Sequence, residues 1–425
     1  MRILMIAPEP FLEPRGTPFS VYYRIKALLS LGYEIELVTY PIGKQVELPG
    51  LNIYRAPALP FVSAVKIGPS LAKFPLDLVL FFAAVRRLRQ GRYHYLHTHE
   101  EAGVMGAVLS SIFGCQHLFD MHSDLSLMVA QFPFFKHPLL VRCVAAVQKW
   151  VVRHADIVIA VTAELKETVE KIAPGKPVHL IRNVAVDEAM PPASEQDVVR
   201  LRQQLQLGSA TVLLYTGTLE FYQGIDLLLQ SAALVHKEIP SAHYVLVGGH
   251  PHQVSMYRQL AQELGITEIV HFTGQRPPEE MPQYMALADI LLSPRREGTN
   301  TPLKLYTYLR SGKPIIATET YSHTELLSSD TSLLVAPTPE GLAQGALELL
   351  RDAEKAHALG TNGKKLADEQ LSWPVFLQKN AQAYDAFTGR VKPGNLRQSK
   401  QLSSITELTT DAVESEPFVH ATQGD

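Results

Sequence analysis

Residues 297–318 read EGTNTPLKLYTYLRSGKPIIAT, and this stretch predicts a loop, a helix and a buried strand in direct succession. Thr301 is a favourable N-cap, and Pro302 suits the first helical position because its missing N–H is not needed there. Gly312 ends the helix, and Pro314–Ala317 is typical of a short buried strand. Strands that alternate with helices in this way favour a parallel sheet covered by helices.

The start of this helix has the features of a phosphate site. The backbone N–H groups of Leu303 and Lys304 would point out of the helix N-terminus, and such an end attracts anions. Lys304 adds a positive charge, and Arg295 and Arg296 can add forked hydrogen bonds to phosphate. The alternative is an ordinary connection in which the two arginines are solvated and Thr301 only caps the helix.

The same alternation runs through the whole chain. The first series of expected strands lies near Ile3–Ala7, Glu34–Thr39, Tyr95–Thr98, Leu118–Asp120 and Ile157–Val161. The second series lies near Thr211–Tyr215, Ala242–Val247, Ile269–Thr273, Ile290–Ser293 and Pro314–Ala317. The expected helices include Phe19–Leu31 and Leu76–Gln90. This pattern predicts an α/β protein with two Rossmann-like, doubly wound domains that face a cleft.

The expected domains divide the chain as follows. The first domain spans residues 1–190 and the second spans 191–372, joined across a segment rich in proline at 191–194. Residues 373–389 form a C-terminal helix that can pack back on the first domain. Residues 390–425 are polar and irregular, and we expect a disordered tail there.

Composition narrows the function classes. The 425 residues carry a net charge of -3, which argues against a general nucleic-acid binder. The two cysteines, Cys115 and Cys143, lack metal-type spacing, and we expect both to be buried in a protein of a reducing compartment. Met1–Ala7 is too short for a signal peptide. The sequence contains no run of 18 apolar residues, so we expect no membrane span. A cytoplasmic protein is expected.

Glycine-containing turns follow several expected strands. Gly16 and Thr17 precede Pro18 after the first strand, which repeats the anion-binding helix start in the opposite domain. Residues 217–224 begin and end with glycine, and Gly248-Gly249 follows another strand. The glycines would let backbone approach a ligand, although an ordinary turn explains each of them as well.

Histidines form the other chemical signal. His122 follows a strand end and has carboxylates nearby in sequence, although a lone histidine is more often structural. His97 and His99 alternate along a strand, so both should lie on one face. A metal site would need a third ligand that the sequence does not assure. We therefore favour structural or substrate-contact roles for these residues over a metal.

Taken together, these motifs carry a family resemblance. The residues concerned are Tyr215-Thr216-Gly217, Gly224-Ile225-Asp226-Leu227-Leu228, Leu246-Val247-Gly248-Gly249, Phe272-Thr273-Gly274, Ala288-Asp289-Ile290 leading to Pro294, Tyr308-Leu309 and Gly312-Lys313-Pro314-Ile315-Ile316-Ala317-Thr318. From Met1 to about Gly389 the chain resembles the retaining glycosyltransferases of family 4, which have the two-domain GT-B architecture.

The resemblance implies a nucleotide-sugar donor on the second domain, an acceptor on the first and transfer with retention. It implies no cofactor and no metal. His122 matches the family's active-site histidine, and Arg182-Asn183 followed by Asp187 resembles its inter-domain segment. We assign catalytic roles to His122 and Glu297. The expected donor contacts are Gly16, Thr17, Arg182, Gly217, Thr218, Gln223, Arg295, Arg296, Asn300, Thr301, Leu303, Lys304 and Thr307.

The chain departs from the family pattern at several donor positions. Thr218 and Gln223 stand where the family usually has Arg and Lys, so Arg295, Arg296, Lys304 or Arg182 would have to supply charge to the diphosphate. Thr299 stands at the first of the paired glutamate positions and Thr307 at the second, ribose-binding one. Glu297 can take the first of these roles only if the loop is two residues longer than usual.

One further segment bears on the acceptor. Residues 73–89 are strongly apolar and end in a basic cluster at Arg86, Arg87 and Arg89. Such a helix can lie on an anionic membrane surface and bring a lipid-linked acceptor to the cleft, or it can belong to the core. We expect a glycosyltransferase of cell-surface polysaccharide or glycolipid synthesis, peripheral on the inner face of the membrane. The alternatives are a nucleotide-sugar epimerase and a non-catalytic nucleotide-sugar-binding relative.

Overall fold

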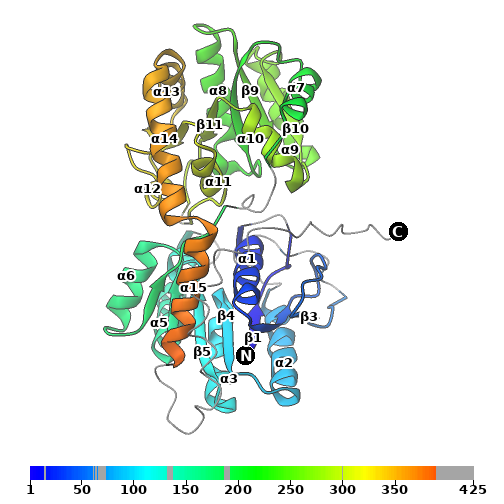
Figure 1. The fold of residues 1–425 in the computed structure, drawn as a ribbon, viewed down its shortest axis with the longest axis vertical. Helices are drawn as coiled ribbons and strands as arrows, with labels where there is room; N and C mark the ends of the chain where they lie inside the picture. The colour runs from blue at the N-terminus through cyan, green and yellow to red at the C-terminus, as the bar shows by residue number, and fades with distance from the viewer. Residues whose placement is uncertain are drawn as a thin grey trace.

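The computed structural model describes residues 1–13, 16–60, 62, 65, 73–131, 137–185, 192–298 and 300–388. The molecule contains two parallel sheets, one in each of two domains that follow one another along its long axis (Figure 1). The first has the strand order β3-β2-β1-β4-β5-β6-β7 and the second β10-β9-β8-β11-β12-β13. This confirms the prediction of two Rossmann-like, doubly wound domains.

The strands of the first sheet are β1 Arg2–Ala7, β2 Glu34–Thr39, β3 Leu51–Arg55, β4 Tyr95–His99, β5 Gln116–Met121, β6 Ile157–Ala160 and β7 Val178–Leu180. Those of the second are β8 Thr211–Thr216, β9 Ala242–Val247, β10 Val270–Gly274, β11 Ile290–Ser293, β12 Ile315–Thr318 and β13 Leu333–Val335. Strands β3, β7 and β13 are not among the strands that the sequence predicts. These strands are only half-buried, so they lack the continuous apolar run of a central parallel strand.

The helices of the first domain are α1 Gly16–Ser30, α2 Lys73–Gln90, α3 Gly103–Phe113, α4 Leu125–Gln131, α5 Pro138–His154 and α6 Ala163–Ile172. Those that follow are α7 Glu195–Gln204, α8 Ile225–His236, α9 Pro251–Glu263, α10 Met281–Leu287, α11 Lys304–Ser311, α12 Tyr321–Thr324, α13 Pro339–Arg351, α14 Ala353–Gln370 and α15 Trp373–Thr388. Short 3-10 turns occur at η1 Glu100–Ala102, η2 Phe221–Gln223 and η3 Pro278–Glu280.

Alternation along β1 shows how the first core is built. Ile3 and Met5 pack in the cluster that includes α1 and α15, whereas Leu4 and Ile6 pack with α2 and α3 on the other face of the sheet. The strand is therefore buried on both faces, as parallel strands between two helical layers must be. Strand β8 divides its side chains between two cores in the same way.

The last helix, α15, leaves the second domain and lies along the first (Figure 1). Its Phe376, Tyr384 and Phe387 are buried in the core that α1 and β1 share. The Phe387 ring stacks on Tyr95 of β4 with centroids 4.7 Å apart. Residues after 388 lie outside the described part of the chain, and so does the segment 186–191 at the predicted domain boundary.

Two local predictions are wrong. Cys143 is exposed because much of α5 faces solvent, and Cys115, which lies just before β5, is only half-buried. Helix α11 begins at Lys304, not at Pro302, and the Thr301 side chain does not cap it. The first turn is closed instead by tight hydrogen bonds from Leu305 N–H to the Pro302 carbonyl and from Tyr306 N–H to the Leu303 carbonyl.

Candidate active site

The centre of the second-domain site is the side chain of Lys304, in the first turn of α11. Its ammonium nitrogen is buried and has no hydrogen-bond partner among the described residues. The nitrogen lies 3.8 Å from the centroid of the Tyr215 ring, which offers partial compensation through a cation–π contact. Burial, with Arg295 nearby, lowers the pKa of Lys304 well below its usual value. A buried amine without a counter-ion is costly, so this site is built to receive an anion.

Two glycine turns place backbone against this amine. A Cβ at Gly217 would lie 3.8 Å from Lys304 Nζ, so the turn after β8 passes directly over the ammonium group. Gly217 has a φ of 137°, and a Cβ at Gly248 would lie 1.9 Å from the Gly217 carbonyl oxygen. Because side chains have no room here, these glycines allow the two turns to pack together beside the ligand space.

The neighbouring arginines differ in what they contact. Arg295 donates to the Asn300 carbonyl at 2.6 Å and lies over the Tyr222 ring, while its Nε has no partner among the described residues. Arg296 forms an ion pair with Asp226 at the start of α8. Arg295 is therefore the better placed to share an anion with Lys304, whereas the charge of Arg296 is already matched.

Other predicted donor residues lie around the same turn. Gln223 is buried, and neither its Oε1 nor the buried hydroxyl of Thr301 has a hydrogen-bond partner among the described residues. Buried polar atoms normally find partners, so these two atoms are compatible with a ligand site that is empty here. Thr307 is buried on α11, and Thr218 accepts a hydrogen bond from Tyr215 on its carbonyl oxygen. Thr299 lies outside the described residues.

Glu297 is exposed on the loop before α11 and interacts electrostatically with Arg295. In the opposite domain, Gly16 and Thr17 open α1, which begins two residues before Pro18, the first helical position that the Thr-Pro pattern indicates. Figure 1 shows α1 and α11 on the facing edges of the two domains. The catalytic role of Glu297 and the donor contacts of Gly16 and Thr17 stay predictions.

Arg182 does not join this cradle. It forms an ion pair of 2.7 Å with Glu325, which follows α12 in the second domain. The same carboxylate accepts a hydrogen bond from Ala163 N–H at the start of α6. Arg182 therefore bridges the two domains, and its charge is matched there. Its contact with the donor stays a prediction, and Asp187 lies outside the described residues.

His122, the predicted catalytic residue, follows β5 and stands over a buried polar network. Its Nε2 lies 3.3 Å from Asp120 Oδ1 and 3.2 Å from His99 Nδ1. Asp120 is fully buried, and Arg24 of α1 donates to its other oxygen at 3.0 Å. That guanidinium holds the pKa of Asp120 well below its usual range despite burial. The Asp120 carboxylate in turn raises the pKa of His122 against the effect of burial.

His97 and His99 lie on one face of β4, as their alternation predicts, with ring centroids 4.6 Å apart. Ligand atoms of these two residues and Asp120 lie within 4.8 Å of one another, which is compatible in distance with a metal ion. These three side chains do not suit a metal ion, because Arg24 already neutralises Asp120 and the Tyr384 hydroxyl already contacts His97 Nδ1 at 2.7 Å. A cation there would face the buried guanidinium.

Glu100 completes the first-domain edge. It has a φ of 48°, unusual for a residue other than glycine, and its Oε2 accepts a hydrogen bond from Ser123 at 2.8 Å. Burial raises the pKa of Glu100 to about 7, while the charge of nearby His122 opposes that rise. Backbone strain and a perturbed carboxyl beside His122 are typical of functional sites.

Most of this network has no counterpart among the residues predicted from sequence. Asp120 enters there only as a carboxylate near His122, and Arg24 does not enter at all. The sequence does contain a signal for Arg24: it is a charged residue on the face of α1 that also carries the apolar residues Val21, Ile25 and Leu28. Nothing local pointed to Asn380 or Tyr384, which reach the network from α15.

The two halves of the chain match two family models. Residues 14–187 match Glycosyltransferase Family 4, and residues 199–366 match Glycosyl transferases group 1. Together these matches cover most of both domains.

Individual relatives are distant. A GDP-mannose-dependent alpha-(1-6)-phosphatidylinositol monomannoside mannosyltransferase of Mycolicibacterium smegmatis is 27% identical over 220 residues, which are 50% of this chain and 56% of that protein. The chain thus matches only about half the length of that relative. A D-inositol 3-phosphate glycosyltransferase of Corynebacterium urealyticum is 26% identical over 402 residues, covering 88% of this chain and 92% of that protein.

Among solved structures, sucrose-phosphate synthase from Thermosynechococcus elongatus has the same fold. It superposes with a TM-score of 0.76 at 22% sequence identity, covering 92% of this chain and 100% of that chain. The two family matches, the paired Rossmann-like domains and the cradle at the edge of the second sheet agree. The chain belongs to the GT-B glycosyltransferases of the family 4 type.

Proposed function

We propose that the chain is a retaining glycosyltransferase that moves a sugar from a nucleotide-sugar to a saccharide or lipid-linked acceptor in cell-surface polysaccharide or glycolipid assembly. The observation that carries this proposal is the buried, unpartnered ammonium group of Lys304 under the Gly217 turn. The names of the two relatives above, one dependent on GDP-mannose, support a donor of this kind.

In the proposed reaction, the bond between the anomeric carbon and a diphosphate oxygen breaks while the acceptor oxygen bonds to that carbon. The acceptor proton passes to the departing diphosphate. Negative charge therefore develops on the diphosphate, where Lys304, Arg295 and the N-terminus of α11 would stabilise it. These groups supply the charge that a metal supplies elsewhere, so we propose a reaction without one. His122 and Glu100 would contact sugar hydroxyls from the first domain.

Two other functions use the same cradle. A nucleotide-sugar epimerase needs acid and base groups but no acceptor, and the perturbed pair His122 and Glu100 could provide them. A non-catalytic relative would bind the donor without turnover, and the threonines at positions 218 and 307 favour that reading because charged family residues are missing there.

The test is an assay with a panel of nucleotide-sugars, each supplied alone and with saccharide or lipid-linked acceptors. We expect one donor to give a glycosylated product only when acceptor is present, with the anomeric configuration of the donor retained in its NMR couplings. Conversion of a donor alone would identify an epimerase. Binding of a donor, detected as thermal stabilisation, with no conversion under any condition would identify the non-catalytic relative.

We also propose that the first domain rests on an anionic membrane surface. Helix α2 buries Leu76, Leu80, Ala84 and Leu88, so one face of the helix belongs to the core. The opposite stripe is exposed, with Phe74 at 67%, Leu78 at 58% and Phe82 at 60% of their surface. Among the described residues, no helix is long and apolar enough to cross a membrane.

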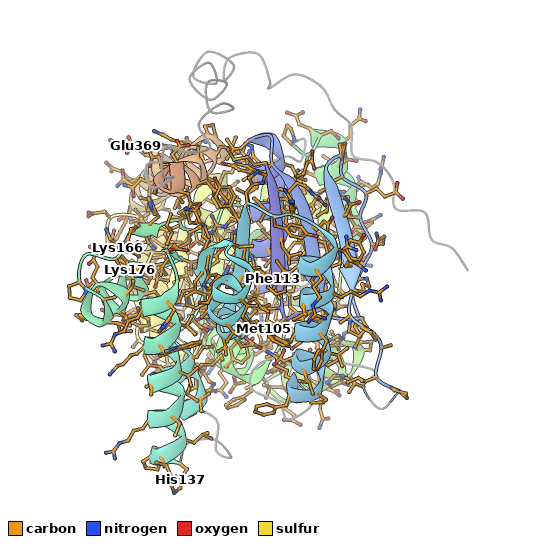
Figure 2. The ribbon with its side chains drawn as sticks, turned by 90° about the horizontal axis from the view of Figure 1, so that it is seen from below. Met105, Phe113, His137, Lys166, Lys176 and Glu369 are labelled. Atoms are coloured by element: carbon orange, nitrogen blue, oxygen red, sulfur yellow. The ribbon has the colours of Figure 1, made fainter. Side chains whose placement is uncertain are left out.

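Helix α5 lies in the same helical layer as α2 and extends away from the sheet towards His137 (Figure 2). It exposes Leu139 and Val147 beside Arg142 and Lys149, an apolar and basic combination that suits a lipid interface. The basic end of α2 contributes less than its sequence indicates. Arg87 pairs with Glu36 at 2.9 Å and lies over the Tyr54 ring, which leaves Arg86 and Arg89 exposed.

We expect the wild-type protein to pellet with vesicles that contain anionic lipid and to remain in solution with neutral ones. Arg86→Glu/Arg89→Glu should weaken binding at least about 30-fold, since each basic residue near such a surface contributes about 1 kcal/mol. The matched control is Lys364→Glu/Lys365→Glu, which reverses two exposed lysines on α14 of the other domain. Equal pelleting of both variants, or no pelleting of the wild type, would contradict this proposal.

A further inference from the structure

We propose that Asp120 is a positioning residue for His122: it fixes the inner ring nitrogen of His122 and thereby commits the outer nitrogen, Nδ1, to the ligand. The catalytic part of this inference rests on the proposed function, whereas the contacts between Asp120 and His122 do not depend on it. The network involves four elements, namely β4, β5, α1 and the returning helix α15.

The first step is the proton on His122 Nε2. This nitrogen lies 3.3 Å from the Asp120 carboxylate and 3.2 Å from His99 Nδ1. Asp120 stays ionised because of Arg24, and burial lowers the pKa of His99 so far that its ring is neutral. A carboxylate is an acceptor only, and a neutral imidazole can accept at Nδ1. The Asp120 carboxylate therefore favours a proton on His122 Nε2, whereas His99 Nδ1 also lies 3.5 Å from Asp120 Oδ2 and donates or accepts according to its own tautomer.

The second step follows from the remaining nitrogen. With Nε2–H held inside the network, Nδ1 is the ring atom left to contact a ligand at the end of β5. When the ring is neutral, Nδ1 can only accept a hydrogen bond. When the ring is protonated, Nδ1 donates one, and it can then bind a sugar hydroxyl or a departing phosphate oxygen. The charge on His122 thus decides its role.

The charged groups around His122 favour the protonated ring. Asp120 and Glu100 raise the pKa of His122, whereas burial and the cationic Arg24 lower it. His97 and His99 are neutral at physiological pH because burial lowers the pKa of both. The result is a raised pKa for His122, so the ring keeps its second proton to higher pH than an exposed histidine.

The third step concerns what holds Asp120 itself. Arg24 donates to Asp120 through Nε and to the Asn380 side-chain oxygen through Nη1 at 2.7 Å. Asn380 also donates to the Phe376 carbonyl of its own helix, and Arg24 lies over the Phe376 ring. The carboxylate is therefore fixed by a guanidinium that α15 in turn holds. Only when α15 packs on the first domain is the network complete.

The test is Asp120→Asn, which keeps the shape of the side chain and removes its charge. We expect the pKa of His122, followed by NMR of ring-labelled histidine, to fall by about 1 to 3. The turnover rate should fall roughly 10- to 100-fold, and its alkaline limb should move to lower pH because the protonated ring is lost sooner. Thermal stabilisation by the donor should persist, since the cradle lies in the other domain.

Two further variants keep the result interpretable. Arg24→Gln/Asp120→Asn removes both buried charges together and serves if the single variant fails to fold. Tyr384→Phe is the matched control, because it removes the hydroxyl at His97 without touching Asp120, and it should leave the pKa of His122 unchanged. An unchanged pKa of His122 in folded Asp120→Asn would overturn the inference, as would an unchanged pH profile. If the wild type transfers no sugar, the proposed function fails, while the NMR titration still decides the role of Asp120.

Discussion

Replacing Lys304 with methionine should make the free protein more stable and nearly abolish sugar transfer. The stability gain is expected because the native ammonium group is buried, unpartnered among the described residues and next to another cation, Arg295. Methionine fills similar space without the desolvation penalty. We expect the free energy of unfolding to rise by about 1–3 kcal/mol, measured by denaturant unfolding of the protein without donor.

Activity should be lost because the same positive charge that destabilises the free protein would stabilise the transition state. In the transition state the departing diphosphate gains charge, and Lys304 would lie against it in a site closed to water. Removing such a group typically slows turnover about 100- to 1,000-fold. Lys364→Met, which alters an exposed lysine of α14, is the control and should change neither quantity beyond a few tenths of a kcal/mol. A Lys304→Met protein that transfers sugar at the wild-type rate would contradict the cradle.

Arg24→Met should be among the most destabilising single changes in the first domain. It leaves the Asp120 carboxylate buried without its main partner and removes the bond to Asn380. Breaking a buried ion pair on one side typically costs about 3–5 kcal/mol. Adding Asp120→Asn should recover a large part of that loss, because the orphaned charge is then absent. Chemical unfolding of both variants and the wild type at neutral pH provides the measurement.

The pH dependence of this pair has a definite sign. The pKa of Asp120 is depressed in the folded protein, so its contribution is complete above the unfolded value of about 4. It is lost as the pH falls below that value towards the folded pKa. The stability difference between wild type and Arg24→Met should therefore narrow in acid. A difference that stays constant down to the acid transition would show that Asp120 is not the group involved.

The central strands could be predicted because they are buried on both faces, and both β2 and β9 lie where their apolar runs indicate. Edge strands such as β3 carry half-exposed side chains, so no local run identifies them. Within the candidate site, the place of Lys304 in the first turn of a helix was predictable from the preceding Thr-Pro. The exact start of α11 was not, because the preceding turn is closed by backbone hydrogen bonds that leave no sequence signal.

Contacts between distant segments account for the remaining differences. Arg182 resembles a donor ligand in sequence, yet it pairs with Glu325, 143 positions away. Asp120 depends on Arg24, 96 positions earlier, and Arg24 on Asn380, 356 positions later. Such pairs are set by how α1, α12 and α15 pack, and a single sequence does not encode these distances in any local pattern.

The most direct measurement is a calorimetric titration of a nucleotide-sugar into the wild-type protein and into Lys304→Met, side by side, in two buffers of different ionisation enthalpy. We expect the wild type to bind the nucleotide-sugar, with proton uptake above neutral pH where the diphosphate raises the depressed pKa of Lys304. In the variant we expect binding at least about 10-fold weaker, and no proton uptake. Equal affinities of the wild type and Lys304→Met would show that the diphosphate does not lie on Lys304.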